Sequence, residues 1–246
     1  MENIVFKYPD TNSSRAGITA LNSKFEGQKI AIIGLGGTGS YILDLIAKTH
    51  VGEIHLYDGD VFQVHNAFRS PGACSPDGFG LDGSLMKVDY YVDIYSRMRN
   101  DVIAHTIYVD ESNINEFSAY DFVFISVDSN KVRSLISKAL LGLKISFIDV
   151  GMGVNLINNE LLGTIRVTAA TPENNSHLQH RIGADEVAEN EYATNIQIAE
   201  LNCLNATLAV IRWKKMVGFY QDFKGEFNSL YLINTGKLLN EDFVNS

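Results

Sequence analysis

The amino-acid sequence predicts an α/β protein with a doubly wound, mainly parallel sheet that continues into antiparallel strands, and with helices on both faces. Short runs rich in β-branched residues alternate with helical patterns over residues 29–148, an order typical of βαβ units. The first run leads into a glycine-rich turn at residues 34–39. After Gly151 the pattern changes to that of an antiparallel hairpin.

Five apolar runs are the candidate strands of the parallel part, at residues 29–33, 53–57, 102–109, 122–127 and 145–148. Helical patterns separate them at residues 39–49, 85–99, 111–117 and 130–141. Parallel neighbours need crossover connections, which are usually helices, so these helices are expected to cover both faces of the sheet.

The second half of the chain follows another plan. Residues 154–157 and 162–169 flank the turn Asn158-Asn159 and predict a β-hairpin. Residues 170–193 are polar and without a clean period, which favours a long mobile or substrate-contacting segment. An amphipathic helix follows at about 195–217, with Gly218 as its stop, and a last strand lies near 229–233.

These patterns indicate a loose N-terminal arm at residues 1–28 and one domain at residues 29–246. Within the domain we expect a nucleotide-binding half at 29–150 and a substrate and dimer half at 151–246. The long helix carries apolar residues on more than one face, which favours a homodimer. These residues are Ile196, Ile198, Leu201, Leu204, Leu208, Val210 and Ile211.

Charge and composition exclude several classes of protein. The 246 residues carry 20 Lys and Arg against 29 Asp and Glu, a net charge of −9, which argues against nucleic acid and anionic membranes as partners. Two cysteines, Cys74 and Cys203, cannot form a disulfide framework or a four-thiolate zinc site. With no signal sequence and no apolar stretch of about 18 residues, we expect a soluble, cytoplasmic protein.

The glycine-rich turn joins a strand to a helix and contains Gly34, Gly36, Gly37 and Gly39. Glycines allow positive φ and let phosphate oxygens approach the backbone amides at a helix N-terminus. Asp58 lies 19 residues beyond Gly39, where an acidic residue is expected to bind a ribose hydroxyl. Taken alone, this part of the sequence favours NAD.

A hydride-transfer enzyme does not need the polar residues that follow. At the carboxyl ends of parallel strands, basic and amide side chains would surround a triphosphate, and two carboxylates could hold Mg²⁺. The residues expected near the phosphates are Asn66, Arg69 and Lys87, with Arg133 further along the chain, and the expected carboxylates are Asp60 and Asp128. This set indicates phosphoanhydride chemistry with ATP.

In this order the motifs resemble the ThiF/MoeB/HesA superfamily, the E1-like adenylation domains of ubiquitin-activating enzymes. The resemblance runs from about Arg15 to the long helix and includes GxGGxG at 34–39, DxD at 58–60 and NxxR at 66–69. It implies a Rossmann-like fold, a ribose-binding Asp58 and a magnesium-placing Asp128. It also implies phosphate-binding roles for Asn66, Arg69 and Lys87, and that Arg15 reaches the partner's triphosphate across a dimer.

The sequence departs from the superfamily pattern in three places. Ser70 replaces the glutamine after the arginine, and residues 71–82 form a longer segment than in compact bacterial members. The paired CxxC motifs of zinc-binding relatives are absent. Residues 170–193, where thioester-forming relatives carry their cysteine, contain none.

Several other residues have a functional and a structural interpretation. Cys74, in a loop near the expected phosphates, is either a nucleophile or an ordinary loop thiol, whereas Cys203 is expected to be a buried small hydrophobe. His177 and His180 are expected in a solvated loop rather than at a metal. The basic cluster at 212–215 fits a helix C-terminus better than a nucleic-acid surface.

The predicted activity is ATP·Mg²⁺-dependent adenylation of a carboxylate, with release of pyrophosphate. By resemblance, the carboxylate is the C-terminal glycine of a ubiquitin-like or sulfur-carrier-like β-grasp protein, and an E2-like or other acceptor takes the acyl group. The alternatives are an ATP-dependent tRNA-modifying enzyme of the same superfamily, and a partner-dependent E1 module without its own thioester cysteine.

Overall fold

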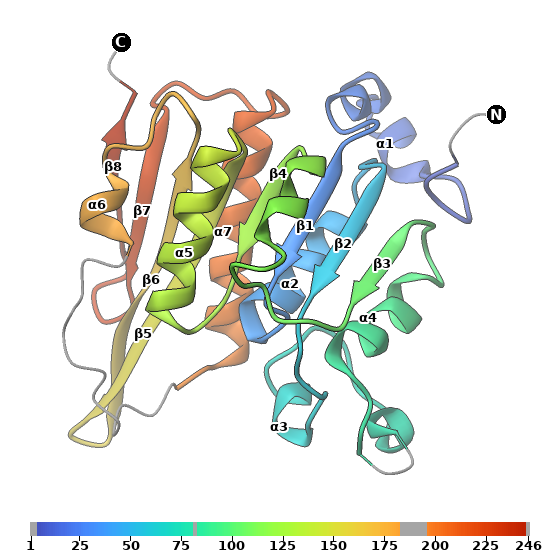
Figure 1. Ribbon diagram of the computed structural model, residues 1–246, viewed down its shortest axis with the longest axis horizontal. Coiled ribbons are helices and arrows are strands. Elements are labelled where there is room, and N and C mark those ends of the chain that lie inside the picture. The colour runs from blue at the N-terminus through green and yellow to red at the C-terminus, as the bar shows by residue number, and fades with distance from the viewer. Residues whose placement is uncertain (1–3, 81–82, 183–195, 245–246) are drawn as a thin grey trace.

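The computed structural model describes residues 4–80, 83–182 and 196–244. Its eight-stranded sheet has the order β3-β2-β1-β4-β5-β6-β7-β8 (Figure 1). The strands are β1 (Lys29–Ile33), β2 (Glu53–Tyr57), β3 (Val102–His105), β4 (Phe122–Ile125), β5 (Ser146–Ile157), β6 (Glu160–Ala170), β7 (Glu226–Leu232) and β8 (Lys237–Phe243).

The α-helices are α1 (Thr11–Arg15), α2 (Gly37–Ala47), α3 (Val64–Ala67), α4 (Lys87–Tyr95), α5 (Asn130–Gly142), α6 (Leu178–Arg181) and α7 (Ala199–Met216). Three short 3₁₀ helices are η1 (Thr19–Lys24), η2 (Pro76–Phe79) and η3 (Ile114–Ala119). No helix in the described ranges is both long enough and apolar enough to cross a membrane.

The first five strands pair in parallel and the last four in antiparallel fashion, with β5 belonging to both parts. The predicted fold class is therefore confirmed, and β1 and β2 have the predicted bounds. The expected strand at 145–148 and the first hairpin strand at 154–157 are one continuous β5, because β6 pairs with it as far as Ile157. Asn158 and Asn159 both have positive φ, which a tight hairpin turn requires.

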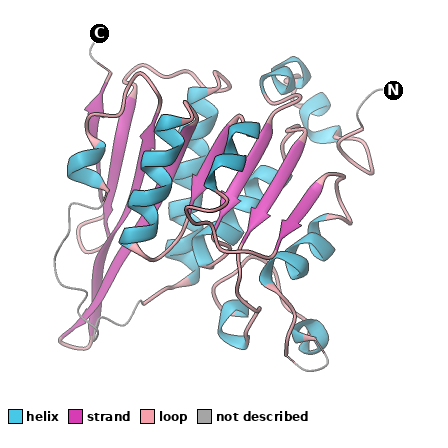
Figure 2. Ribbon diagram, viewed as in Figure 1, coloured by secondary structure: helices cyan, strands magenta, loops and turns pink. Residues whose placement is uncertain are grey.

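Helices cover both faces of the sheet, as Figure 2 shows. Alternate side chains of β1 point to opposite faces. Ile30 and Ile32 pack in a core with residues of α2, α4 and α7, whereas Ala31 and Ile33 pack with residues of η3, α5 and α6.

The prediction of a loose N-terminal arm was wrong. Asp10 caps α1 by accepting hydrogen bonds from the amides of Asn12 and Ser13. Phe25, just after η1, is buried and stacks on Trp213 of α7 with ring centroids 5.0 Å apart. These contacts are tertiary, so no local pattern indicated them. Figure 1 shows α1 at the end of the sheet opposite to α3.

Other boundaries also differ from the prediction. The helix expected at 111–117 is the 3₁₀ helix η3, the strand expected at 102–109 ends at His105, and the edge strand β8 was missed. The polar segment at 170–193 begins with a packed part, since Leu178 of α6 and Ile182 are buried. Residues 183–193 lie outside the described residues.

Candidate active site

The glycine-rich turn between β1 and α2 can be built only with glycine at its key positions. Gly34 has φ +86°, and a Cβ there would collide with the Ser126 carbonyl oxygen. A Cβ on Gly39 would collide with the Gly34 carbonyl oxygen, whereas Gly36 faces open space. The turn therefore brings the start of α2 close to the residues that follow β4. It leaves the first backbone amides of α2 without an intrahelical acceptor.

Paired acidic and basic side chains lie at the end of β2. We call this group the Lys87 cluster; its members are Asp58, Asp60, Lys87 and Tyr108. Asp58 is buried and accepts hydrogen bonds from the amides of Leu35 at 2.7 Å and Asp60 at 2.9 Å. The Lys87 ammonium lies 3.4 Å from both Asp58 oxygens and 2.6 Å from Asp60 Oδ2. The Lys87 cluster thus ties the glycine loop to α4.

Tyr108 completes this cluster by donating its hydroxyl hydrogen bond to Asp60 Oδ1. Burial raises the pKa of Asp60, but the hydrogen bonds from Lys87 and Tyr108 outweigh it and leave that pKa below its ordinary value. Because each Asp60 oxygen already has a protein donor, the structure does not favour Asp60 as a magnesium ligand.

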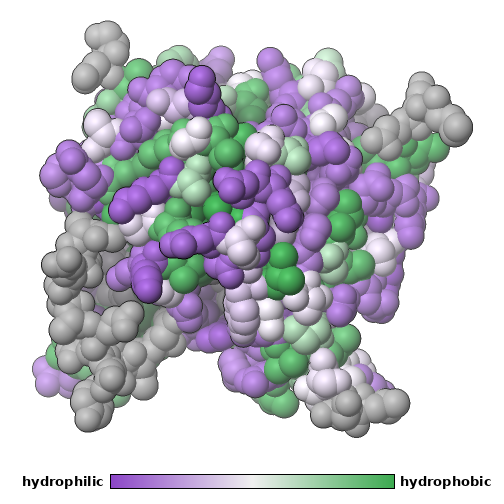
Figure 3. Space-filling model, in the orientation of Figure 1, coloured by the Kyte–Doolittle hydropathy of each residue, from purple (hydrophilic) through white to green (hydrophobic). Residues whose placement is uncertain are grey.

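Two predicted phosphate-binding residues follow β2: Asn66 lies on helix α3, and Arg69 comes just after that helix ends. Asn66 is buried, and its Oδ1 accepts the Gln63 amide hydrogen bond at 2.8 Å in a capping box. The Nε of Arg69 is buried and has no partner within the described part of the chain. Burial lowers the pKa of Arg69, and the negative charge of Asp128 counteracts this. Figure 3 shows hydrophobic side chains on the lower projection that carries α3, where Phe68 is 81% exposed.

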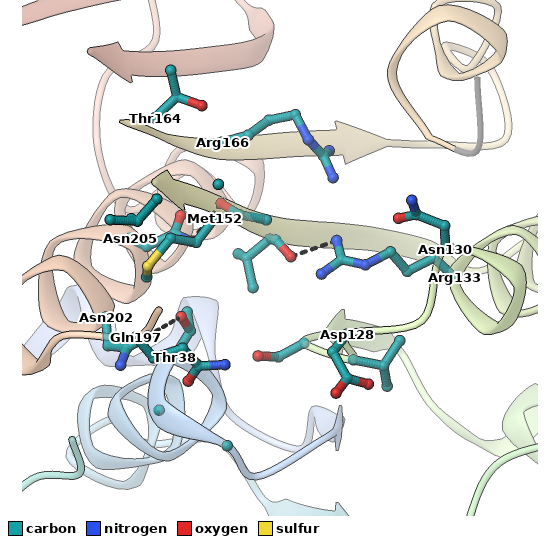
Figure 4. A pocket seen from close by; sticks show the side chains of 18 of the residues that line it. Thr38, Asp128, Asn130, Arg133, Met152, Thr164, Arg166, Gln197, Asn202 and Asn205 are labelled. Carbon is teal, nitrogen blue, oxygen red and sulfur yellow. Dashed lines mark hydrogen bonds between the residues drawn. The ribbon is translucent and has the colours of Figure 1, made fainter. Parts of the chain in front are cut away.

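A polar cavity of about 730 Å³ lies beside the glycine loop at the carboxyl ends of β4 and β5. Gly36, Gly37 and Thr38 line one wall, Asp128 follows β4, and residues of β5, β6 and the N-terminal part of α7 line the rest. Figure 4 shows Asp128 and Thr38 facing the strands that carry Met152 and Arg166.

Two arginines share one carboxylate in the cavity wall, and these residues form the Asp149 cluster: Arg133, Asp149 and Arg166. Asp149 is fully buried at the end of the parallel part of β5. Arg133 of α5 donates through Nη1 to both Asp149 oxygens, at 3.0 and 2.9 Å, and to the Val150 carbonyl oxygen at 2.6 Å. Arg166 of β6 donates to Asp149 Oδ2 at 2.5 Å.

The N-terminal part of α7 and the residue before its N-cap place carboxamide groups against the other wall. Thr38 donates to Asn202 Oδ1 at 2.9 Å, and Asn205 Nδ2 donates to the Gly151 carbonyl oxygen at 3.0 Å. Asn202 Nδ2, Asn205 Oδ1 and Gln197 Oε1 are buried without a hydrogen-bond partner in the described ranges. Such groups cost free energy unless a ligand or water satisfies them.

The structure brings most of the predicted site residues to one end of the sheet. Asp58, Asp60 and Lys87 contact one another, and at the same end Asn66 lies on α3 with Arg69 just after it (Figure 1). Gly36, Gly37 and Asp128 line the cavity. Arg15 is exposed on α1 at the opposite end, so a single chain does not unite it with the others (Figure 1). Its role across a dimer stays a prediction.

The remaining candidates have mostly structural roles. His177 is buried and hydrogen-bonded to the Ala169 carbonyl oxygen at 2.8 Å, so its placement in a solvated loop was wrong, while His180 is exposed. Cys203 is partly exposed rather than fully buried. Cys74 is also partly exposed, packs against the core and is not among the residues that line the cavity.

The basic cluster at the end of α7 is engaged within the protein. Arg212 is buried and pairs with Asp222, Lys215 pairs with Glu226 at 2.5 Å, and Trp213 is fully buried. Lys214 lies over the rings of Phe25, Phe219 and Tyr220.

In the described part of the chain, no group of three or more His, Cys, Asp or Glu side chains is arranged to hold a metal.

Sequence reasoning missed Asp149, Arg166, Tyr108 and the α7 amides. Asp149 follows a predicted strand, just as Asp58 and Asp128 do, and that position was the available signal. Arg166 and Asn202 carry no such signal, because only the hairpin and the packing of α7 bring them to the cavity.

Comparison with known proteins gives a family and a set of relatives. The sequence model of the ThiF family matches residues 14–200. Ubiquitin-like modifier-activating enzyme 5 of Culex quinquefasciatus is 24% identical over 158 residues, which are 60% of this chain and 39% of that protein. The tRNA threonylcarbamoyladenosine dehydratase of Haemophilus influenzae is 26% identical over 126 residues, 50% of this chain and 46% of that protein. The chain thus spans less than half the length of each relative.

Solved structures share the fold at low sequence identity. The crystal structure of E. coli MccB with ATP has a TM-score of 0.73 and 18% identity, and the match covers 98% of this chain and 74% of that chain. The crystal structure of PaaA has a TM-score of 0.69 and 17% identity, covering 97% and 76% of the two chains.

Proposed function

The chain belongs to the ThiF family, and on that basis we propose that it catalyses ATP-dependent adenylation of a carboxylate. The products would be an acyl-adenylate and pyrophosphate. One observation carries the proposal: a single cavity joins the N-terminus of α2 and the exposed carboxylate of Asp128 on one side to an arginine-rich wall on the other. This arrangement fits a reaction in which a phosphate chain and a second anion meet.

The chemistry requires positioning and charge neutralisation more than a protein nucleophile. A carboxylate oxygen attacks the α-phosphorus, the new O–P bond forms, and the bond to the β-phosphate oxygen breaks as pyrophosphate leaves. The amides of α2 would bind phosphate oxygens, and Arg69 would neutralise the charge that develops on the leaving group, while Lys87, paired with Asp58 and Asp60, would hold the glycine loop in place.

The donor set near the glycine loop fits a magnesium ion. Mg²⁺ in nucleotide sites is commonly held by one or two carboxylates together with phosphate oxygens, and when bound it neutralises phosphate charge. Asp128 is exposed, lines the cavity and lies beside Gly36 and Gly37 in that wall. It is the residue that would hold the ion.

For the substrate we propose the C-terminal glycine of a ubiquitin-like protein, transferred to a separate acceptor. The relatives named as ubiquitin-like modifier-activating enzymes support this choice. Exposed Leu156, Ile157 and Leu161 at the tip of the β5–β6 hairpin offer an apolar contact for such a partner. A homodimer in which Arg15 reaches the partner's triphosphate remains part of the proposal.

A second candidate is ATP-dependent activation of a carboxyl group on a tRNA nucleoside. The similarity to the Haemophilus influenzae dehydratase favours it. The net charge of −9 weighs against it, since RNA binding depends on phosphate neutralisation.

Two measurements on the purified chain test the proposed function. Calorimetry compares ATP·Mg²⁺ with NAD, and ATP–pyrophosphate exchange is then assayed with ubiquitin-like proteins and with tRNA as carboxylate sources. We expect ATP·Mg²⁺ to bind and a ubiquitin-like protein to stimulate exchange. Binding of NAD alone, or exchange that none of these substrates stimulates, would refute the proposal.

The chain is also expected to stop at the adenylate. Neither Cys74 nor Cys203 lines the cavity, so no thiol of the described residues stands ready to attack the acyl-adenylate. A reductant-sensitive adduct on a non-reducing gel that disappears in Cys74→Ala would contradict this expectation.

A further inference from the structure

We propose that Arg133 binds the substrate's carboxylate through the free edge of its guanidinium, and that Asp149 and Arg166 hold Arg133 in the orientation that presents this edge. The inference rests on the proposed adenylation reaction. It adds to that reaction the residue that receives the second substrate.

Within the described residues, Arg133 donates all of its hydrogen bonds through one nitrogen. Nη1 donates to Asp149 and to the Val150 carbonyl oxygen. Nε is buried without a partner in the described ranges, and Nη2 makes no hydrogen bond there either. The N–H groups of Nε and Nη2 point the same way and form the fork that accepts a carboxylate with two parallel hydrogen bonds. The edge suited to a carboxylate is therefore the unused one.

The burial of Arg133 gives this free edge its significance. Only 9% of the residue is exposed, yet it lines the cavity. A buried N–H without a partner costs free energy. An anion that occupies the edge recovers this cost, whereas a surface arginine would satisfy the same groups with water.

Charge in the Asp149 cluster also requires an anion. Two guanidinium groups share the single carboxylate of Asp149, which is fully buried. One positive charge is left without compensation inside the cluster. Among the described residues that line the cavity, Asp128 is the one acidic side chain, and it belongs to the segment after β4 rather than to the Asp149 cluster.

The location of Arg133 favours the attacking carboxylate over the nucleotide phosphates. The phosphate-binding amides belong to α2, at the wall that carries Thr38, whereas the Asp149 cluster comes from α5, β5 and β6. Figure 4 shows Arg133 and Arg166 on the strand side of the cavity, across from Thr38. An anion held there faces the phosphate wall, which is the approach that in-line attack requires.

The step needs no further reagent. The carboxylate oxygen forms its bond to the α-phosphorus while the bond from phosphorus to the β-phosphate oxygen breaks, and the electron pair leaves with pyrophosphate. Arg133 keeps its protons throughout. Its part is to hold the carboxylate, remove water from it and orient one oxygen.

The test begins on the wild-type protein with two probes that differ only at their end. N-acetylglycylglycine has a free carboxylate, and N-acetylglycylglycinamide replaces it with an uncharged amide. The Nε–H resonance of Arg133 is followed by ¹⁵N–¹H NMR in the presence of a non-hydrolysable ATP analogue and Mg²⁺. We expect the acid to shift this resonance and the amide to leave it in place.

Variants then separate binding of the carboxylate from binding of ATP. Arg133→Lys keeps the charge and loses the fork, so we expect its KM for the acid in pyrophosphate exchange to rise about 10- to 100-fold. Its Kd for ATP should stay within about twofold. Arg97→Lys, at an exposed position just after the end of α4, is the matched control and should change neither value.

The possible outcomes distinguish a failure of this binding site from a failure of the proposed reaction. Equal responses to acid and amide, or an unchanged KM in Arg133→Lys, would overturn the subsite while exchange itself upholds adenylation. A larger shift with inorganic pyrophosphate than with the acid would assign the edge to the nucleotide and overturn it as well. A shift by the acid without any exchange would support the subsite and refute the proposed function.

Discussion

The two ion clusters of the site differ in how completely they are paired. In the Lys87 cluster, one lysine serves two carboxylates, and a tyrosine and two backbone amides supply the remaining hydrogen bonds. In the Asp149 cluster, one buried carboxylate serves two arginines, and the Nε of Arg133 is left without a partner within the described ranges. The first cluster is negative by one charge and the second positive by one.

This difference separates residues that hold the backbone in place from residues that can bind a ligand. A group whose polar atoms are all engaged fixes backbone geometry, as Asp58 does for the glycine loop by accepting the Leu35 amide. A group with buried, unengaged donors is costly by itself and becomes favourable when a ligand is present. We therefore expect substitutions at the two ends to separate effects on stability from effects on activity.

The largest effect is expected on activity at Asp128. The side chain is exposed, so Asp128→Ala should change the free energy of unfolding by no more than about 0.5 kcal/mol. Pyrophosphate exchange should fall by about 10²- to 10³-fold, because the ion that neutralises the phosphates loses its protein ligand. Exchange assays and urea unfolding measure the two quantities, with Glu111→Ala as an exposed control. Near-normal exchange would remove Asp128 from the mechanism.

The next largest effect is expected on stability, when one carboxylate charge is removed from each cluster in turn. Asp149→Asn leaves the buried Arg133 and the partly buried Arg166 without their anion and should cost about 3–5 kcal/mol of stability. Asp60→Asn removes a half-exposed carboxylate and leaves Asp58 beside Lys87, so its cost should not exceed about 1 kcal/mol. Chemical denaturation of both variants tests the ranking, and equal costs would contradict the distinction between the clusters.

A smaller effect is expected where α7 touches the glycine loop. A Cβ on Gly37 would collide with the carboxamide of Asn202, so Gly37→Ala should cost about 1–3 kcal/mol. Asn202→Ala in the same chain should return part of that loss. Gly142→Ala, where a Cβ meets open space, is the control. Purely additive effects of the two substitutions would show that the contact does not form.

The smallest expected effect is the pH dependence of the Lys87 cluster. Because the pKa of Asp60 is lowered in the folded state, its contribution is present above the unfolded pKa of about 3.9 and is lost as the pH falls through the folded value. The difference in Tm between wild type and Asp60→Asn should be constant from about pH 5 to 7 and shrink below about pH 4. A difference in Tm that grows as the pH falls would show that folding raises the pKa of Asp60 rather than lowering it.

The sequence predicted the parts of the molecule that depend on local order. Strands β1 and β2 are short apolar runs bounded by polar residues, and the glycines of the loop have a required backbone geometry, so both were identified. The N-terminal arm and α6 have no period of their own. Their order comes from tertiary contacts such as Phe25 on Trp213, which a linear pattern does not contain.

The candidate site divides in the same way. Asp58, Lys87 and Asp128 occupy positions fixed by strand ends and motif order, so they could be named in advance. The Asp149 cluster depends on α5 and on the continuation of β5 into its hairpin with β6. The sequence predicted that hairpin, but it did not indicate that Arg166 of the hairpin and Arg133 of α5 would both bind Asp149.

The first two turns of α7 touch both walls of the cavity, with Asn202 bound to Thr38 and Asn205 bound to the Gly151 carbonyl oxygen. One short rigid element therefore links the nucleotide loop to the strand that carries Asp149. If nucleotide binding changes the affinity for the acyl substrate through this element, thermodynamic linkage requires the acyl substrate to change nucleotide affinity by the same factor. Asn202 and Asn205 would then set the order of substrate binding without contacting the reacting atoms.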